Sequence, residues 1–251
     1  GGAGLAVSLP DVVDVGDRVE GLEWMAPWAA WGFTVRSPDG VLLRAVGASV
    51  PWDYFRRLGV EPVHGRLFTA EEGRPGHAPV VVLSHGFWTE VLGGDPDAVG
   101  RSVELGAAVY TVVGVAPAGF VDPVAEVIGI GLPQPRAWRS TPPSFDPLAR
   151  SRANRDVWSI GRVRAGTDRG RVLEELRAVA AALAEVHPET NAGRGLTLVG
   201  AREARTGSVR PTLLALLAGV GVLLLIACAN VANLFLSRAV RRSREMAVRI
   251  S

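Results

Sequence analysis

The sequence contains no lysine, so all 27 of its basic residues are arginines. A Walker A phosphate-binding loop needs a lysine that reaches the phosphates, and this chain therefore cannot be its own P-loop ATPase. No GxGxxG motif followed by a suitable acidic residue is present, which argues against a dinucleotide-binding site. We expect the chain to carry no cofactor.

Cysteine is also nearly absent, because Cys228 is the only one. An intrachain disulfide and a cysteine-based metal site are both excluded. The four histidines are scattered without the spacing of a zinc motif, and no GxSxG nucleophile elbow is present. Ser84 and His85 are adjacent, but neighbouring residues of a helix or strand do not face each other, so Ser84 is predicted to cap a helix. We expect no catalytic residue and no metal site.

Charge is distributed unevenly along the chain. Residues 1–210 carry 22 arginines against 24 acidic residues, whereas residues 238–251 carry five arginines against one glutamate. The basic character is therefore confined to the C-terminal tail. It fits membrane orientation and anionic headgroups better than nucleic-acid binding, because no basic stripe is interleaved with stacking aromatic residues.

The longest apolar stretch runs from Pro211 to Ser237 and contains no charged residue. At a rise of about 1.5 Å per residue it is long enough to cross a bilayer core about 30 Å thick, so it predicts a transmembrane helix over residues 212–237. The alternative is a buried helix of a soluble protein, which is seldom this long without a polar face. The arginine-rich tail then places the C-terminus in the cytoplasm and residues 1–210 outside it.

The outside part is predicted to be a mixed α+β domain, a mixed sheet with packed helices. The N-terminal residues lack the pattern of an export signal, so we expect an upstream span beyond this sequence and treat the chain as a fragment of a longer protein. The predicted strands cover residues 33–36, 41–46, 80–83, 102–105, 109–115, 157–163 and 195–200. The predicted helices cover residues 10–31, 51–58, the stretch from Ser84 to Gly93-Gly94, and 169–186.

Two stretches are harder to interpret. On the predicted helix 10–31, Trp24, Trp28 and Trp31 would share one face, which could stack a ligand or touch a membrane surface, although core packing is the simpler interpretation. Residues 117–155 are dense in Pro, Gly and Arg and are predicted to be an irregular insertion or a second subdomain.

Four residues of the predicted span are candidates for helix–helix contact in the membrane. Asn230 and Asn233 are three apart, and we expect their amides to hydrogen-bond to another helix, the alternative being that they lie near the headgroups and are hydrated. Ala215 and Gly219 are four apart and would permit close helix approach, although small residues are common in such spans.

Five stretches in chain order resemble the permease subunits of MacB/FtsX-type ABC transporters, and only residues 117–155 depart clearly from the pattern. They read PWDYFRRLGVEPVHGRLFTAEEG, PVVVLSHGFWTEVLGGDPDAVGRSVEL, YTVVGVAPAGF, IGRVRAGTDRGRVLEELRAVAAALAEVHPETN and LLLIACANVANLFLSRAVRRSREMAVRIS. The resemblance implies that residues 1–205 are a MacB-like periplasmic core domain of two subdomains. It implies that residues 206–251 begin an FtsX-like permease domain, with the second transmembrane helix and a cytoplasmic coupling segment at 238–251.

By the same resemblance, the partners would be an ABC ATPase subunit, a second permease copy, a periplasmic adaptor and the lipid bilayer of the bacterial inner membrane. The chain would be non-catalytic and would transmit ATP-driven movement across the membrane for efflux or export. Topology and ATPase coupling are assigned to Arg238, Arg241, Arg242, Arg244, Glu245 and Arg249, although the arginines could serve topology alone.

An alternative for the whole chain is a single-pass anchored binding or sensor module without an ATPase partner. A third class, an extracytoplasmic hydrolase, lacks a convincing nucleophile, base or metal set.

Overall fold

The computed structural model describes residues 6–74, 76–128, 133–140, 150–201, 216–226 and 228. The chain divides into two compact units, which are described separately. The larger unit covers residues 2–199, and the smaller one covers residues 200–251 together with Gly1.

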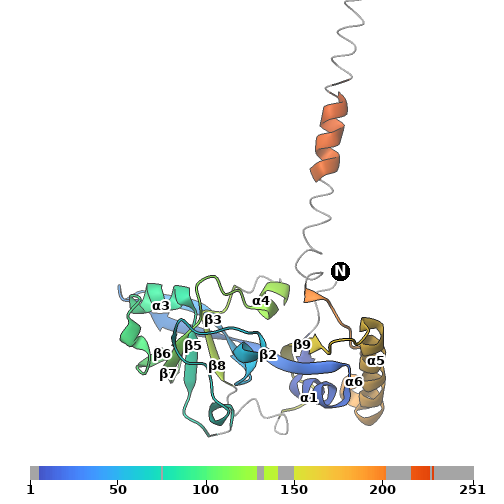
Figure 1. Ribbon diagram of the computed structural model, residues 1–251, viewed down its shortest axis with the longest axis horizontal. Coiled ribbons are helices and arrows are strands. Elements are labelled where there is room, and N and C mark those ends of the chain that lie inside the picture. The colour runs from blue at the N-terminus through green and yellow to red at the C-terminus, as the bar shows by residue number, and fades with distance from the viewer. Residues whose placement is uncertain are drawn as a thin grey trace, which may run out of the picture. The chain divides into compact units, whose positions relative to one another are not determined.

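The larger unit contains strands and helices in mixed order. Its strands are β1 (Val7–Ser8), β2 (Leu22–Arg36), β3 (Leu42–Val50), β4 (His64–Gly65), β5 (Val80–Leu83), β6 (Ser102–Leu105), β7 (Ala108–Val115), β8 (Ala137–Ser140) and β9 (Arg155–Val163). Its helices are α1 (Leu9–Arg18), α2 (Tyr54–Arg57), α3 (His85–Leu92), α4 (Pro123–Ile128), α5 (Arg169–Val186) and α6 (Pro188–Asn191), with 3-10 helices η1 (Glu71–Gly73) and η2 (Pro96–Ala98). The sheet has the order β1-β9-β2-β3-β8-β5-β7-β4, with β6 beside β7 (Figure 1). Because parallel and antiparallel pairs occur together, the predicted mixed α+β class is confirmed.

Strand β2 connects the two halves of this unit. Its first part pairs antiparallel with β9, and its second part, residues 29–36, pairs antiparallel with β3. The β9 side carries α1, α5 and α6, whereas the β3 side continues into β8, β5 and β7 (Figure 1). We call residues 6–28 with 155–199 the terminal lobe, and residues 29–140 the inner lobe. One continuous strand therefore belongs to both lobes.

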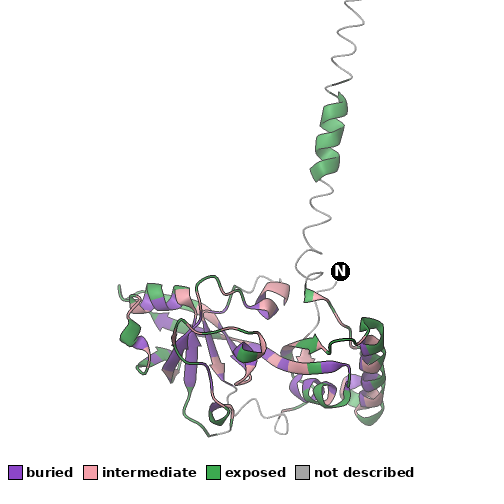
Figure 2. Cartoon of the chain, viewed as in Figure 1, coloured by how far each residue is buried: buried purple, intermediate pink, exposed green. Residues whose placement is uncertain are grey.

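The inner lobe has helices on both faces of its sheet, and strand β5 shows this arrangement. Val80 and Val82 belong to a core cluster with side chains of α2 and α4, whereas Val81 and Leu83 belong to a second cluster with side chains of α3. Alternate residues of a strand point to opposite faces, so a four-residue apolar run buried on both sides is a central strand. Figure 2 shows these central strands as the most buried part of the chain.

The β2–β3 hairpin forms as the turn sequence predicted. Gly40 has a φ of 81°, its N–H donates to the carbonyl of Ser37, and the N–H of Ser37 donates to the carbonyl of Val41. Farther along the ribbon, Gly47 lies opposite Trp31, and a Cβ on Gly47 would lie 2.5 Å from the indole ring. A glycine at this position lets the tryptophan lie flat against the neighbouring strand.

The predicted helix 10–31 is wrong beyond its first half. Helix α1 ends at Arg18, and the three tryptophans lie in strand β2. Trp28 is fully buried in the core cluster that contains side chains of α4, whereas Trp31 packs against the core cluster that contains side chains of α3. A spacing of three and four residues is compatible with one helical face, but aromatic residues favour strands, and pairing with β9 and β3 decided the outcome. The three tryptophans take part in core packing, which was the simpler interpretation of their spacing.

Two further expectations need correction. Residues 117–155 were predicted to be an irregular insertion or a second subdomain, and their described part is not irregular throughout, because it forms α4 and places β8 in the middle of the sheet between β3 and β5. Residues 195–200, which were predicted to be a strand, are not paired in any sheet of the described residues, although Leu196 and Leu198 pack against the core of the terminal lobe. A short strand is defined by its partners, which sequence periodicity does not reveal.

Helix α5 confirms its prediction at both ends. Asp168 caps it by accepting a hydrogen bond from the N–H of Arg171, and the helix ends before His187-Pro188. The predicted apolar face is buried at Val172, Leu176, Val179 and Leu183. Val186 was assigned to the same face but is 67% exposed, because it lies past the end of the packed turn.

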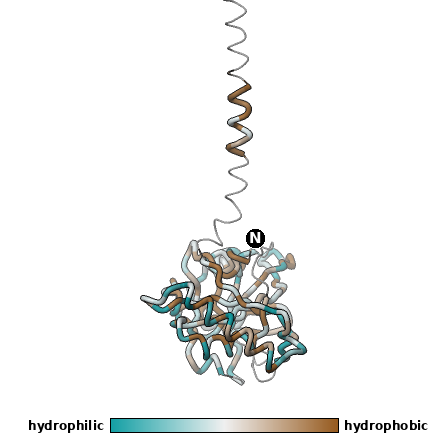
Figure 3. Tube along the Cα trace, turned by 90° about the vertical axis from the view of Figure 1, so that its right-hand side faces the viewer, coloured by the Kyte–Doolittle hydropathy of each residue, from teal (hydrophilic) through white to brown (hydrophobic). Residues whose placement is uncertain are grey.

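In the smaller unit, residues 216–226 are helical and exposed. Most of them are apolar, as the brown colour of this stretch in Figure 3 shows. Leu217 and Leu224 are 71% and 66% exposed. Among the residues that the structure describes, no helix has both the length and the apolar character needed to span a membrane. The rest of the predicted span, 212–215, 227 and 229–237, lies outside the described residues.

Candidate functional site

Most residues assigned to the membrane and to coupling lie outside the described part of the chain. Only Gly219 falls inside it, in the helical stretch 216–226, where a Cβ would have no atom within 4 Å. The positions that lie outside it are Ala215, Asn230, Asn233, Arg238, Arg241, Arg242, Arg244, Glu245 and Arg249. The site that the structure does define is a set of buried polar clusters in the larger unit.

Ser84 occupies the helix-capping position that the sequence predicted. Its Oγ accepts a hydrogen bond of 3.1 Å from the N–H of Phe87, at the first turn of α3. The ring of His85 lies edge-on to Trp88, with 5.3 Å between ring centroids. The serine hydroxyl is thus engaged with the helix backbone.

Surface features of the described residues offer little enclosure. No group of three or more His, Cys, Asp or Glu side chains is placed there to hold a metal ion. An open depression of about 400 Å³ lies at the start of α5 and is lined by Glu20, Gly21, Arg164, Thr167 and Arg171. Its two arginines are already engaged, Arg171 with Glu175 at 2.9 Å and Arg164 with the backbone carbonyls of residues 20 and 22.

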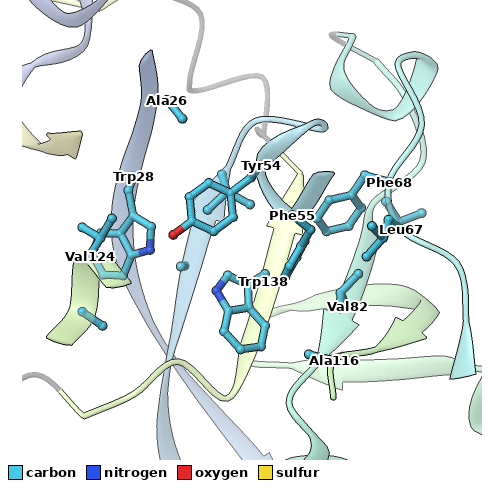
Figure 4. Packing of buried hydrophobic residues seen from close by; sticks show 14 of the residues in the cluster. Ala26, Trp28, Tyr54, Phe55, Leu67, Phe68, Val82, Ala116, Val124 and Trp138 are labelled. Atoms are coloured by element: carbon cyan, nitrogen blue, oxygen red, sulfur yellow. The ribbon is translucent and has the colours of Figure 1, made fainter. Parts of the chain in front are cut away.

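The carboxylate of Asp122 is the centre of a buried polar cluster. Its Oδ2 accepts hydrogen bonds from the indole nitrogens of Trp28, at 3.2 Å, and Trp138, at 2.8 Å. Its Oδ1 accepts from the hydroxyl of Tyr54 at 3.1 Å and from two backbone N–H groups at the start of α4. Figure 4 shows the polar atoms of the three aromatic side chains directed toward one another. One carboxylate therefore joins β2, α2, β8 and α4.

Burial dominates the electrostatics of this cluster. Asp122 is completely buried, and loss of water raises the pKa of its carboxyl above the ordinary value of 3.8, although the hydrogen bonds from Trp138, Ala125, Trp28 and Val124 act to lower it. Burial also raises the pKa of the Tyr54 hydroxyl, with a further contribution from the charge of Asp122. Every donor around the carboxylate is an uncharged group, so the cluster depends on hydrogen bonds alone.

A second polar cluster holds the terminal lobe together around Asp11 of α1. The Asp11 carboxylate accepts from Arg152 at 2.6 Å and from Asn191 of α6 at 3.1 Å, and it lies 3.5 Å from Arg155. Arg152 also contacts Asp14, again at 2.6 Å. Because Asp11 is 3% exposed, these pairs are shielded from solvent and fix α1 against the start of β9 and α6.

A third cluster fixes the connection between β4 and β5. Glu72 accepts two hydrogen bonds from the guanidinium of Arg66, at 2.9 and 2.7 Å, and one from the N–H of Thr69 at 2.8 Å. Burial of the Glu72 carboxyl acts to raise its pKa, but these hydrogen bonds outweigh burial, and the net pKa lies below the ordinary 4.5.

The Glu72→Gln variant is expected to lose about 1 kcal/mol of unfolding free energy at neutral pH, because the Arg66 side chain is half exposed and water screens the pair. A carboxyl with a lowered pKa stabilises the fold above its unfolded-state pKa, and this contribution is lost as the pH falls through the folded-state pKa. The difference between the two proteins should therefore begin to shrink as the pH falls below 4.5 and should vanish only below the lowered folded-state pKa. Urea unfolding at several pH values measures it.

The exposed neighbour Glu71 is the matched control for this prediction. Glu71→Gln removes an exposed carboxylate of the same helix, η1, for which the described residues provide no hydrogen bond or ion pair of the kind seen at Glu72. It should change stability by less than about 0.5 kcal/mol. Equal effects of the two substitutions would contradict the role given to Glu72.

Sequence reasoning missed all three clusters. The partners of Asp122 are 94, 68 and 16 residues away along the chain, so no local sequence pattern predicts these contacts. One signal was present, because an Asp followed by Pro123 is typical of a helix N-terminus, and Asp122 does cap α4. That signal locates a cap, but it does not predict a buried carboxylate with two indole donors.

Comparison with known proteins gives a consistent result. A family model described as MacB-like periplasmic core domain matches residues 1–179. Among solved structures, the periplasmic region of MacB from Actinobacillus actinomycetemcomitans has a TM-score of 0.50 at 15% identity, covering 74% of this chain and 77% of that one. The extracellular domain of the noncanonical ABC-type transporter YknZ from Gram-positive bacteria has a TM-score of 0.51 at 15% identity, covering 76% and 90%. No curated protein sequence matches the chain.

Proposed function

Because the chain belongs to the family of MacB-like periplasmic core domains, we propose that it is part of the permease subunit of an ABC-type transporter, with residues 1–205 as its extracytoplasmic domain. The observation that carries this proposal is the order of features along the chain. The family match over residues 1–179 is followed by the uncharged apolar stretch 211–237 and then by an arginine-rich tail. A folded domain, a membrane-length apolar stretch and a basic segment in this order suit a membrane permease.

The proposed mechanism is mechanical. The apolar stretch is the second transmembrane helix and begins an FtsX-like permease domain over residues 206–251. ATP binding in a partner ATPase displaces the tail, and the helix carries that displacement to the extracytoplasmic domain. The buried clusters support this role, because the one around Asp11 ties α1 to β9 and α6, and the one around Asp122 ties Trp28 of the terminal lobe to α2, α4 and β8 of the inner lobe. Both therefore favour movement of the domain as one body. No catalytic residue, metal or cofactor is needed.

The assembly we propose has several parts. The permease acts as a dimer in the bacterial inner membrane, with an ATPase on the cytoplasmic side and a periplasmic adaptor on the other, and it serves efflux or export. Within the membrane, Asn230 and Asn233 hydrogen-bond to another helix, and the small residues Ala215 and Gly219 allow helices to approach closely.

The tail provides the test of coupling. Glu245 and Arg249 are four residues apart, a spacing that would place them on one face if this segment were a helix. In the intact permease, exchanging them by Glu245→Arg and Arg249→Glu should uncouple ATP hydrolysis from transport, whereas single-charge substitutions that preserve the sign, Glu245→Asp and Arg249→Lys, should retain coupling. The measurement is transport per ATP hydrolysed in proteoliposomes that contain the ATPase. Unchanged coupling in the exchanged variant would remove the tail from the mechanism.

A second function from another class is a single-pass anchored binding or sensor module without an ATPase. Purification of the intact protein from its native membrane distinguishes the permease from the sensor module. A permease retains an ATPase subunit, and loses it when residues 238–251 are deleted. Recovery of the protein without any ATPase, in the presence or absence of the tail, would favour the sensor.

A further inference from the structure

The end of the β2–β3 hairpin exposes an unusual group of apolar side chains. Val41, Leu42 and Leu43 are 57%, 63% and 38% exposed. Elsewhere in the described part of residues 6–199, exposed large apolar residues occur singly. Single exposed residues are ordinary on protein surfaces, whereas three in succession indicate a contact surface.

The hairpin end holds these side chains in a fixed arrangement. The two strands stay paired up to Arg36 and Leu42, and the guanidinium of Arg36 donates to the carbonyl of Gly40 at 2.9 Å. On its other side, β3 pairs with β8 from Gly47 onward, and the carbonyl of Val46 accepts a hydrogen bond from the N–H of Arg136 at 2.7 Å, so no strand of the described residues covers residues 42–45 from there. The β2 edge of the ribbon is held at Thr34, whose carbonyl accepts a hydrogen bond from the N–H of Gly106 at 2.8 Å. The exposed residues thus lie on a preformed ribbon that is uncovered along β3 at residues 42–45, and its binding would cost little ordering.

The charges beside the apolar group are mainly basic. On the ribbon, Arg36 lies opposite Leu42, and Arg44 lies opposite Thr34. Neither arginine has an ion-pair partner among the described residues. The only acidic residue between them is Asp39 in the turn. Arginines flanking exposed aliphatic side chains match the boundary of a bilayer, where anionic headgroups lie above the acyl chains.

The membrane is also within reach of this unit if the chain is a permease. Only residues 200–210 separate the larger unit from the apolar stretch, and eleven extended residues span at most about 40 Å. We propose that the hairpin end, residues 36–44, is a lipid-contact site at which the aliphatic side chains enter the headgroup region and Arg36 and Arg44 bind anionic headgroups. This inference rests on the membrane-bound permease proposed above.

The test is a fluorescent label on the intact protein in proteoliposomes of phosphatidylcholine with or without phosphatidylglycerol. In a Cys228→Ser background, Leu42→Cys carries an environment-sensitive dye, and doxyl-labelled lipid is the quencher. Val186→Cys is the matched control, because Val186 is also an exposed aliphatic residue, at 67%, but lies on α5. We expect quenching at position 42 to exceed that at 186 by about twofold or more, and to require phosphatidylglycerol.

The charge dependence provides a second readout. Arg36→Gln together with Arg44→Gln should abolish most of the quenching, so that adding phosphatidylglycerol no longer increases it. Equal quenching at 42 and 186 in protein that resists carbonate extraction would overturn the lipid site alone and point to a protein partner for the hairpin. Failure of the protein to resist carbonate extraction would overturn both this inference and the proposed function.

Discussion

Replacing Asp122 with alanine is expected to lower the free energy of unfolding by about 3 kcal/mol, the largest effect of any single substitution considered for the larger unit. The two indole N–H groups and the Tyr54 hydroxyl would lose their acceptor in a place that water cannot reach, because Trp28, Tyr54 and Trp138 are at most 1% exposed. Each buried donor left without a partner costs roughly 1–3 kcal/mol. Removal of a buried charge recovers part of that sum, since desolvation raises the carboxyl pKa.

The pH dependence of this variant has a defined sign. A carboxyl whose folded-state pKa is raised stabilises the fold more when protonated, so its contribution decreases as pH rises from 3.8 through the raised pKa. The difference between the natural protein and Asp122→Ala should therefore be larger in acid than at neutral pH. This is opposite to the expectation for Glu72, whose pKa is lowered.

Three further variants make the prediction specific. Asp122→Asn should also destabilise strongly. Its NH2 group is a hydrogen-bond donor and would face the indole N–H groups of Trp28 and Trp138, which are donors too and need an acceptor. Tyr54→Phe should cost only about 1 kcal/mol, since it removes one donor and leaves no group unpaired. Asp97→Ala, at an exposed aspartate, should be nearly neutral. Denaturation followed by tryptophan fluorescence measures all four, and a neutral Asp122→Ala would contradict the role of this carboxylate.

The second large effect is expected in the apolar stretch. Leu217 and Leu224 are exposed in the helical part of residues 216–226 and are not part of any core cluster of the described residues. Arginine at both positions should leave the larger unit folded, because that unit does not include them. In a bilayer, however, each arginine at the centre of a helix costs roughly 3 kcal/mol.

In the chain of residues 1–251 expressed on its own, without the other spans proposed for the permease, Leu217→Arg with Leu224→Arg should therefore shift the protein from the carbonate-resistant membrane fraction to the extractable fraction. Leu217→Ile with Leu224→Ile is the matched control and should remain in the membrane, since it preserves apolar surface. Retention of the double arginine variant in the resistant fraction would show that this stretch does not cross the membrane.

Sequence periodicity predicted elements whose order is set locally. Helix α5 has apolar residues at helical spacing, a capping Asp168 and a terminating Pro188, and its bounds came out as predicted. The hairpin of β2 and β3 followed from its Pro-Asp-Gly turn. In both cases the residues that decide the structure are close along the chain to the helix end or turn that they specify.

The failures concern structure that depends on distant residues. The tryptophans of β2 fit a helical spacing, and only pairing with β9 and β3 makes them part of a strand. Strand β8 has four residues and is identifiable only from its neighbours β3 and β5. The role of Asp122 as a buried hydrogen-bond acceptor depends on three aromatic residues on other elements, and local propensity does not predict such contacts.

The central claim is that the two ends of this chain lie on opposite sides of a membrane. It is tested most directly with single cysteines in a Cys228→Ser background of the intact protein, one at exposed Asp97 in the larger unit and one at Ser243 in the tail. Spheroplasts are treated with a membrane-impermeant thiol reagent before and after permeabilisation. Position 97 is expected to react before permeabilisation and position 243 only after it. Reaction of position 97 only after permeabilisation, or of both positions before it, would contradict the account.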